Sequence, residues 1–276
     1  MWEITLFLFP SFVACVVLLA ILGYLGLHVL EREIIFIDIT LAQIAALGSV
    51  LAVILAHQNH DDPGLVTRLF SIGCTIAAAA FFSFIAKNVK QISHETLIGV
   101  TYAIAAAAML FVLSLSTGSD IHLEEMLTGS ILWLQWSEIL SGVVVFSIIG
   151  LFHYIFRKQF IEISQDYHGS LKKGNNTIVW DFLFYASMGI VITYTVEMAG
   201  VLLTFAFLII PATFSTLFSK HWGKRMAIAG ILGMTVSIAG LLFSYRFDFS
   251  CGPTIVAIMG LTLVGAVFVK KIFCIA

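Results

Sequence analysis

The chain has 276 residues, of which 60% are hydrophobic and only 11% are charged, and its mean hydropathy is +1.05. Soluble domains carry roughly 25% charged residues, so this composition excludes a water-soluble globular protein. The net charge of −2 provides no basic face, and we expect no nucleic-acid partner. The four cysteines contain no C-x-x-C pair, which argues against a disulfide framework or a zinc cluster.

Long apolar runs follow one another along the chain, separated by short charged or turn-forming clusters. Each run approaches the roughly 20 residues that a helix needs to cross the hydrocarbon core of a bilayer. The pattern predicts an all-α integral membrane protein, a polytopic bundle of about nine transmembrane helices in a single domain, residues 1–276. Eight or ten helices are alternatives, because the count depends on a tight turn that Glu197 would form with Met198, Ala199 and Gly200. The predicted helices cover residues 4–27, 34–56, 66–86, 96–115, 136–156, 178–195, 198–219, 226–245 and 253–269.

Basic residues gather in alternate loops, and cytoplasmic loops are the ones that retain lysine and arginine. With nine helices, the basic segments 157–173, 220–225 and 270–271 all fall on one side of the membrane. We therefore expect the N-terminus outside and the C-terminus in the cytoplasm.

Small residues are concentrated in "LAQIAALGSVLA", "GCTIAAAA" and "GVTYAIAAAA". Helices in lipid associate through close backbone approach at small residues. These three segments are expected to line the packed interior of the bundle, although alanine and glycine are also simply common in membrane helices.

Polar side chains within the apolar runs are candidates for function, because they are costly in the membrane and usually face a cavity or a partner. The candidates are Asp38, Gln43, Glu138, His153, Asp181 and Glu197. Asp38 and Asp181 lie near the predicted inner boundary, where we expect both to extend toward water. Gln43 lies deeper, where an interhelical hydrogen bond and a substrate contact are equally suitable explanations.

Two loops carry further candidates. The outer loop "HQNHDD" places His57, His60 and Asp61 together, a set of nitrogen and oxygen ligands that suits zinc or manganese, with a plain solvated loop as the alternative. The inner loop 157–177 alternates apolar residues with charged ones. It predicts either a short helix beneath the membrane that meets a soluble partner or a plain surface loop.

No G-x-x-x-x-G-K-[ST] motif occurs in the sequence, so the chain is not expected to bind nucleotide phosphates or to act as an enzyme.

Three segments resemble the permease subunits of ABC-type zinc and manganese importers, the ABC-3 family. They are "GVLLTFAFLIIPATFSTLFS", "SYRFDFSCGPTIV" and "ETLIGVTYAI", and the resemblance extends in order from Gly26 to Val256. It implies a homodimer in the bacterial inner membrane that works with an ATP-binding ABC subunit and an extracytoplasmic metal-binding protein. The implied substrate is a divalent metal, with no permanently bound cofactor.

The resemblance also implies roles for particular residues. The loop 157–177 would be the cytoplasmic coupling segment, with Ile161, Asp166 and Gly169, or Gly174, in the ATPase contact. Asp38, Gln43, Glu197 and Pro211 would lie along the substrate path, with Pro211 bending its helix. An ion-coupled secondary transporter is the alternative function.

The second predicted helix departs from the family pattern. The family commonly has an aspartate and, four residues later, a histidine, where this chain has Ile39 and Gln43. An amide oxygen is a poorer zinc ligand than imidazole, so the transport role is expected to persist while the identity of the metal stays open.

Overall fold

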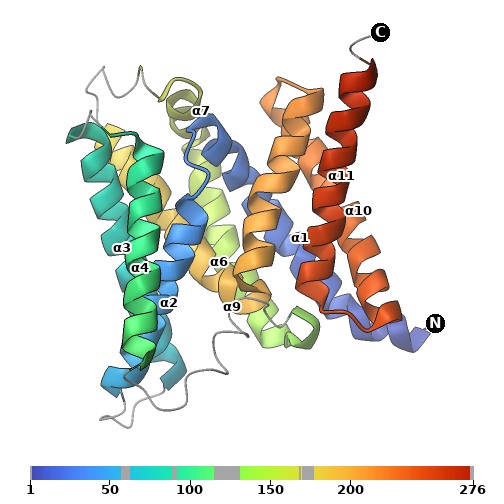
Figure 1. Ribbon diagram of the computed structural model, residues 1–276, viewed down its shortest axis with the longest axis horizontal. Coiled ribbons are helices and arrows are strands. Elements are labelled where there is room, and N and C mark those ends of the chain that lie inside the picture. Colours follow the sequence, from blue (N-terminus) through green and yellow to red (C-terminus); the bar gives the residue numbers. More distant parts are fainter. Residues whose placement is uncertain are drawn as a thin grey trace. The chain divides into compact units, whose positions relative to one another are not determined.

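The computed structural model describes residues 2–56, 63–88, 92–114, 131–167, 169 and 177–273. Within these ranges the chain is helical, without strands, as predicted (Figure 1). The helices are α1 (Trp2–Glu31), α2 (Ile37–Ala56), α3 (Pro63–Asn88), α4 (His94–Ser114), the 3-10 helix η1 (Ile131–Trp133), α6 (Trp136–Ile155), α7 (Arg157–Gln165), α9 (Thr177–Phe218), α10 (Trp222–Phe247) and α11 (Cys251–Phe273).

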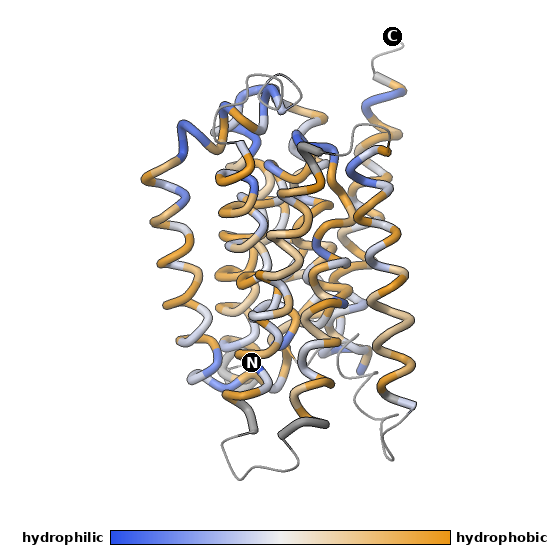
Figure 2. Tube along the Cα trace, turned by 90° about the vertical axis from the view of Figure 1, so that its left-hand side faces the viewer, coloured by the Kyte–Doolittle hydropathy of each residue, from blue (hydrophilic) through white to orange (hydrophobic). Residues whose placement is uncertain are grey.

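Seven of the described helices are long and apolar enough to cross a membrane, namely α1, α3, α4, α6, α9, α10 and α11, and α2 contributes a shorter apolar stretch, Ile37–Val53. Hydrophobic residues fill the middle of these helices, and hydrophilic residues gather toward their ends (Figure 2). Helix α9 has 42 residues, about 63 Å at 1.5 Å per residue. That length is about twice the hydrocarbon thickness of about 30 Å, enough for two crossings. The polytopic all-α bundle is therefore confirmed.

The two predicted helices, 178–195 and 198–219, both lie in α9, which consists of two helical stretches separated by a break. The break falls at Gly200, with φ 77° and ψ 166°, the last residue of the turn expected at 197–200. Residues with a side chain almost never adopt this combination. Pro211, expected to bend this helix, keeps helical dihedral angles. The interruption in α9 therefore depends on a glycine eleven residues before the proline.

The chain forms two compact units. The first unit comprises Met1–Leu30, Glu125–Ile148 and Thr195–Ala276, and the second comprises Glu31–Glu124 and Ile149–Tyr194. Each unit is assembled from segments distant in sequence, which is why no linker or change of composition marks a boundary along the chain.

In the second unit, α2 packs against both α3 and α4. A Cβ added to Gly48 of α2 would lie 2.9 Å from the Cα of Ser71 on α3. Ser71 Oγ donates a 2.9 Å hydrogen bond to the Ala45 carbonyl, and Thr40 Oγ1 of α2 donates a 3.2 Å bond to the Ile98 carbonyl of α4. Close packing at small residues is thus confirmed at Gly48.

In the first unit, α10 and α11 lie side by side (Figure 1), with Gly240 of α10 against Ile255 of α11. Gly233 of α10 packs against the Leu19 side chain of α1. Glycines at these positions allow the helices to approach more closely than any larger residue would permit.

Candidate coupling site and substrate path

Helix α7 follows α6 after a single residue and is amphipathic. Its buried side chains are Phe160, Ile163 and Ser164, followed by Tyr167 just beyond its end. Spacings of three and four residues place these side chains on one face of a helix. The opposite face exposes Lys158, Gln159, Glu162 and Gln165. The structure thus contains the short amphipathic helix that was predicted in this loop.

Phe160 anchors the first part of α7. Its side chain is fully buried, and its ring stacks on His153 of α6, with centroids 4.2 Å apart and planes at 14°. It also meets Trp180 of α9 edge-on at 5.4 Å. His153 Nε2 lies 2.8 Å from Ser187 Oγ, so this polar residue of the fifth predicted helix is a packing residue between α6 and α9.

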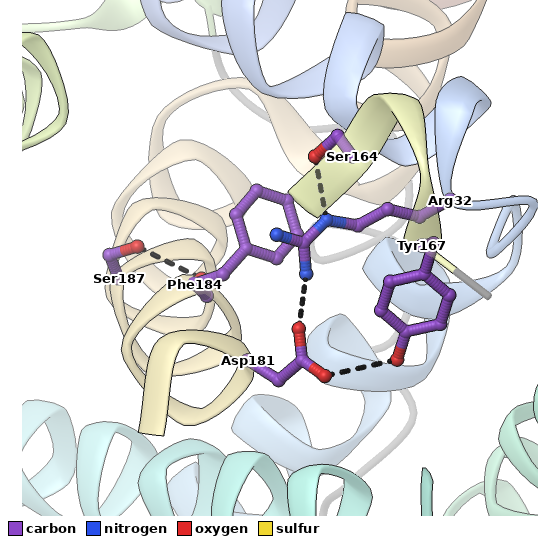
Figure 3. A network of polar contacts seen from close by, with 6 residues as sticks. All are labelled: Arg32, Ser164, Tyr167, Asp181, Phe184 and Ser187. Carbon is purple, nitrogen blue, oxygen red and sulfur yellow. Dashed lines mark hydrogen bonds and ion pairs between the residues drawn. The ribbon is translucent and has the colours of Figure 1, made fainter. Parts of the chain in front are cut away.

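Arg32, the residue directly after α1, anchors the end of α7 (Figure 3). Its Nε donates a 2.9 Å hydrogen bond to Ser164 Oγ, and its Nη1 donates a 2.8 Å bond to Asp181 Oδ1. Both side chains of this ion pair are 0% exposed. The guanidinium carbon also lies 4.1 Å from the centre of the Phe184 ring, a favourable cation–π contact.

Tyr167 completes the network (Figure 3). Its hydroxyl donates a 3.1 Å hydrogen bond to Asp181 Oδ2, so each carboxylate oxygen of Asp181 accepts one bond. Burial raises the pKa of Tyr167 above its ordinary value, and the nearby Tyr185 and Asp181 raise it further. The hydroxyl therefore stays protonated and remains a donor at physiological pH.

The expectation that Asp181 extends toward water is wrong. Its carboxylate is fully buried and paired with a cation that precedes it by 149 residues. Charges are buried only when paired and hydrogen-bonded, and Arg32 and Tyr167 meet that requirement. In the sequence, Arg32 is a basic residue between two apolar runs. Any basic residue at the inner membrane surface has that appearance, so the sequence did not indicate that Arg32 forms a buried ion pair.

Of the predicted coupling residues, Ile161 lies in the middle of α7, whereas Asp166 and Gly169 lie at and beyond its end. Ile161 is half-buried, and Asp166 is exposed at the C-cap. Asp166 Oδ1 accepts a 3.0 Å hydrogen bond from the backbone N–H of Gly169, where a Cβ would overlap the Asp166 carboxylate. Asp166 and Gly169 together therefore fix the path of the chain as it leaves the helix.

Asp38, predicted to extend toward water, is instead only 1% exposed near the start of α2. Its Oδ1 accepts a 2.7 Å hydrogen bond from the Ile39 N–H, and its Oδ2 has no hydrogen-bond partner among the described residues. Glu95 of α4 interacts electrostatically with it and accepts a 3.1 Å bond from the Phe36 N–H. The packing of α4 against α2 covers Asp38, which hydropathy along the chain does not predict.

Gln43 lies one turn further along α2 than Ile39, and both side chains are half-buried. The amide makes no hydrogen bond with another described residue, so the interhelical bond considered from sequence is absent within the described part of the chain. Ile39 and Gln43 share one helix face, as residues four apart do.

The other predicted path residues, Glu197 and Pro211, belong to the first unit. Glu197 is exposed on α9, and Pro211 is buried. The predicted metal ligands His57, His60 and Asp61 lie outside the described residues. Within the described ranges, no group of three or more His, Cys, Asp and Glu side chains is arranged to hold a metal ion.

Long apolar helices, close packing at glycines, and an amphipathic helix anchored by a buried ion pair define a polytopic membrane protein of the transport-permease class. A family model confirms this class more specifically. The model of the ABC 3 transport family matches residues 5–270, and the chain belongs to that family.

Individual relatives have low sequence identity to this chain, but their alignments cover most of its length. A protein of Chlamydia pneumoniae named a probable metal transport system membrane protein is 24% identical over 274 residues, covering 96% of this chain and 90% of the relative. The manganese transport system membrane protein MntC of Listeria monocytogenes is 26% identical over 187 residues, covering 66% of this chain and 65% of the relative.

Among solved structures, PsaBC from Streptococcus pneumoniae, in complex with a Fab, matches with a TM-score of 0.75. The sequences are 22% identical, and the match covers 94% of this chain and 90% of that chain. This similarity establishes a shared fold.

Proposed function

We propose that this chain is the membrane permease of an ATP-driven importer for a divalent metal, with zinc or manganese as the best candidates. The single observation that carries the proposal is α7, an amphipathic helix between two apolar ones, with its buried face fixed and its polar face exposed. A permease that hydrolyses no ATP itself needs a surface of this kind, through which a separate ATP-hydrolysing chain can drive its conformational change. Membership of the ABC 3 transport family and the names of the relatives support the same function.

The exposed face of α7 is the proposed contact for the ABC subunit. Glu162 and Gln165 point away from the buried face, so their replacement by alanine should weaken complex formation without disturbing the fold. Glycine substitutions from Ile161 to Tyr167 should uncouple transport while the protein remains in the membrane. Normal uptake and normal complex formation in both sets would show that this segment has no role in coupling.

Asp38, Gln43, Glu197 and Pro211 are proposed as residues of the substrate path, as the resemblance to the family implies. Carboxylate and amide oxygens suit manganese better than they suit zinc, which prefers imidazole and thiolate. With Ile39 and Gln43 in place of the family's aspartate and histidine, we expect the path to hold metal loosely. The outer loop residues His57, His60 and Asp61 are proposed as a weak entry site.

The working assembly is proposed to be a homodimer of this chain in the bacterial inner membrane, with the N-terminus outside and the C-terminus in the cytoplasm. It would bind ATP-binding ABC subunits on the cytoplasmic face and receive metal from an extracytoplasmic binding protein. It would need no permanently bound cofactor.

Uptake of radioactive zinc and manganese into proteoliposomes tests the function directly. Vesicles with this chain and its ABC subunit should import metal only when ATP is supplied at the cytoplasmic face, and the chain alone should hydrolyse no ATP. Uptake driven by an ion gradient, without ATP or a partner, would identify an ion-coupled secondary transporter instead. ATP hydrolysis by the pure chain would also contradict the proposal.

A further inference from the structure

The buried face of α7 is attached at three positions to residues outside α7, in α6, in α9 and directly after α1. Phe160 packs on His153 and Trp180. Ser164, four residues later, accepts a hydrogen bond from Arg32. Tyr167, three residues further, donates one to Asp181. The attachments thus extend along the whole length of α7.

The partners of α7 lie at the ends of long apolar helices. Arg32 immediately follows α1, and Asp181 is the fifth residue of α9. Helix α6 leads directly into α7 through Phe156. The chain passes from one compact unit to the other at the end of α1, within α6 and within α9. Helix α7 is therefore connected to each of the three described helices through which the chain links its two units.

The chemistry of the Arg32 contacts makes the attachment directional. One planar guanidinium donates to Ser164 of α7 and to Asp181 of α9 at the same time, while its face lies on Phe184 (Figure 3). A guanidinium presents its donors in a rigid fork, so the two bonds together fix both distance and angle. Because the pair is excluded from water, no solvent molecule is at hand to replace a bond that is lost when α7 shifts.

We propose that Arg32, with Asp181, Ser164 and Tyr167, forms a strut that transmits displacement of α7 to the ends of α1 and α9. Arg32 is a positioning residue in this proposal and does not touch the metal. A permease without the strut still binds its ABC subunit, but movement of α7 is absorbed locally and less metal is imported for each ATP hydrolysed. The inference rests on the proposed function and names the element through which that function is coupled.

The test measures metal import and ATP hydrolysis together in proteoliposomes that contain the permease and its ABC subunit. Two single variants each remove one hydrogen bond with little change in shape, Tyr167→Phe and Ser164→Ala. A third variant, Arg32→Met with Asp181→Leu, removes the ion pair as a whole. Replacing both partners of a buried ion pair by apolar residues of similar volume is often neutral for stability, whereas removing one partner leaves an unpaired buried charge.

Matched controls remove the same groups elsewhere. Tyr102→Phe removes a phenol hydroxyl from the exposed part of α4. Ser83→Ala removes a buried hydroxyl that donates only within its own helix, to the Ala80 carbonyl. Thermal melting in detergent and co-purification of the ABC subunit are recorded for every variant, so that loss of fold or of docking is recognised.

The ratio of metal imported to ATP hydrolysed is expected to fall about fivefold or more. A fivefold change is at the lower end of typical couplings between two sites. This fall should occur in the Arg32→Met/Asp181→Leu variant and to a smaller degree in both single variants, with melting temperature and co-purification retained. The controls should keep the wild-type ratio.

An unchanged ratio in the folded Tyr167→Phe and Ser164→Ala variants would overturn the strut, and would do so even if the double variant failed to fold. Failure of the proposed function gives a different result, because wild-type vesicles would then import no metal with ATP. Wild-type import with insensitive variants therefore rejects only the strut.

Discussion

Gly26 of α1 lies directly against the backbone of Leu208 in α9, so closely that a Cβ at Gly26 would overlap the Leu208 carbonyl oxygen. The same Cβ would lie 3.3 Å from the Cβ of Ala212, the residue after Pro211. The α-hydrogen of Gly26 meets the backbone of Leu208, and the contact leaves no room for a methyl group. Leu208 and Pro211 belong to the segment 200–219, whose sequence resembles the ABC-3 family, and the contact with Gly26 gives that segment a packing role with α1.

Gly26→Ala should therefore destabilise the protein, by about 1–3 kcal/mol, the typical cost of overpacking a core. The obstacle is a carbonyl oxygen of the main chain, which cannot rotate away as a flexible side chain can. Gly23→Ala, one turn earlier on the same helix, is the matched control, because a Cβ there meets nothing within 4 Å. Melting in detergent should fall for the first variant only, and equal melting of both would show that α1 and α9 separate at no cost.

Gly200→Ala should destabilise the protein for a different reason. The observed φ of 77° with ψ of 166° is essentially restricted to glycine, and a residue with a side chain costs about 1–3 kcal/mol there. Gly260→Ala in α11, where a Cβ meets no neighbour, controls for the added methyl group. Comparable yields and melting temperatures for both variants would mean that α9 needs no break at position 200.

Gln43→Leu should reduce metal uptake while leaving co-purification of the ABC subunit intact. The side chain is half-buried and has no hydrogen-bond partner among the described residues, so its amide is available to a passing ion. A contact of this kind contributes about 1 kcal/mol, and uptake at limiting metal should fall about fivefold. Normal uptake by this variant would assign Gln43 to helix packing.

The companion variant, Ile39→Asp with Gln43→His, places the family's aspartate and histidine on the same face of α2. Imidazole binds zinc more strongly than an amide oxygen does, so metal should be retained longer and the preference should move toward zinc. Competition between radioactive zinc and manganese in vesicles measures the change. Gln43→Asn, which keeps the amide, is the control for altered side-chain volume, and an unaltered preference would place the selective site elsewhere.

Labelling in intact cells tests the predicted orientation. Ser137 is exposed in the first turn of α6, and Lys158 is exposed in α7, three residues after α6 ends. The 20 residues of α6 span about 30 Å, one hydrocarbon thickness. In a cysteine-free background, a membrane-impermeant thiol reagent should label Ser137→Cys in intact cells and Lys158→Cys only after lysis. The Asn59→Cys and Lys173→Cys pair should behave in the same way, and labelling of Lys158→Cys in intact cells would reverse the topology.

The sequence by itself determined the class of fold, the bounds of α6 to within one residue and the resemblance to the family. The predicted helix 136–156 corresponds to α6 at Trp136–Ile155, because the length of an apolar run is set by the membrane and needs no knowledge of neighbours. The amphipathic spacing of Phe160, Ile163 and Ser164 likewise defines α7 locally.

Only the tertiary structure decided which polar groups meet. Asp38 and Asp181 each lie near the end of an apolar run and have the same appearance in sequence, yet one has a carboxylate oxygen without a hydrogen-bond partner among the described residues and the other pairs with Arg32. Arg32 and Asp181 are 149 positions apart, and no local periodicity connects them. Their pairing follows from how α1, α7 and α9 pack, because a buried charge is stable only where packing brings it a partner.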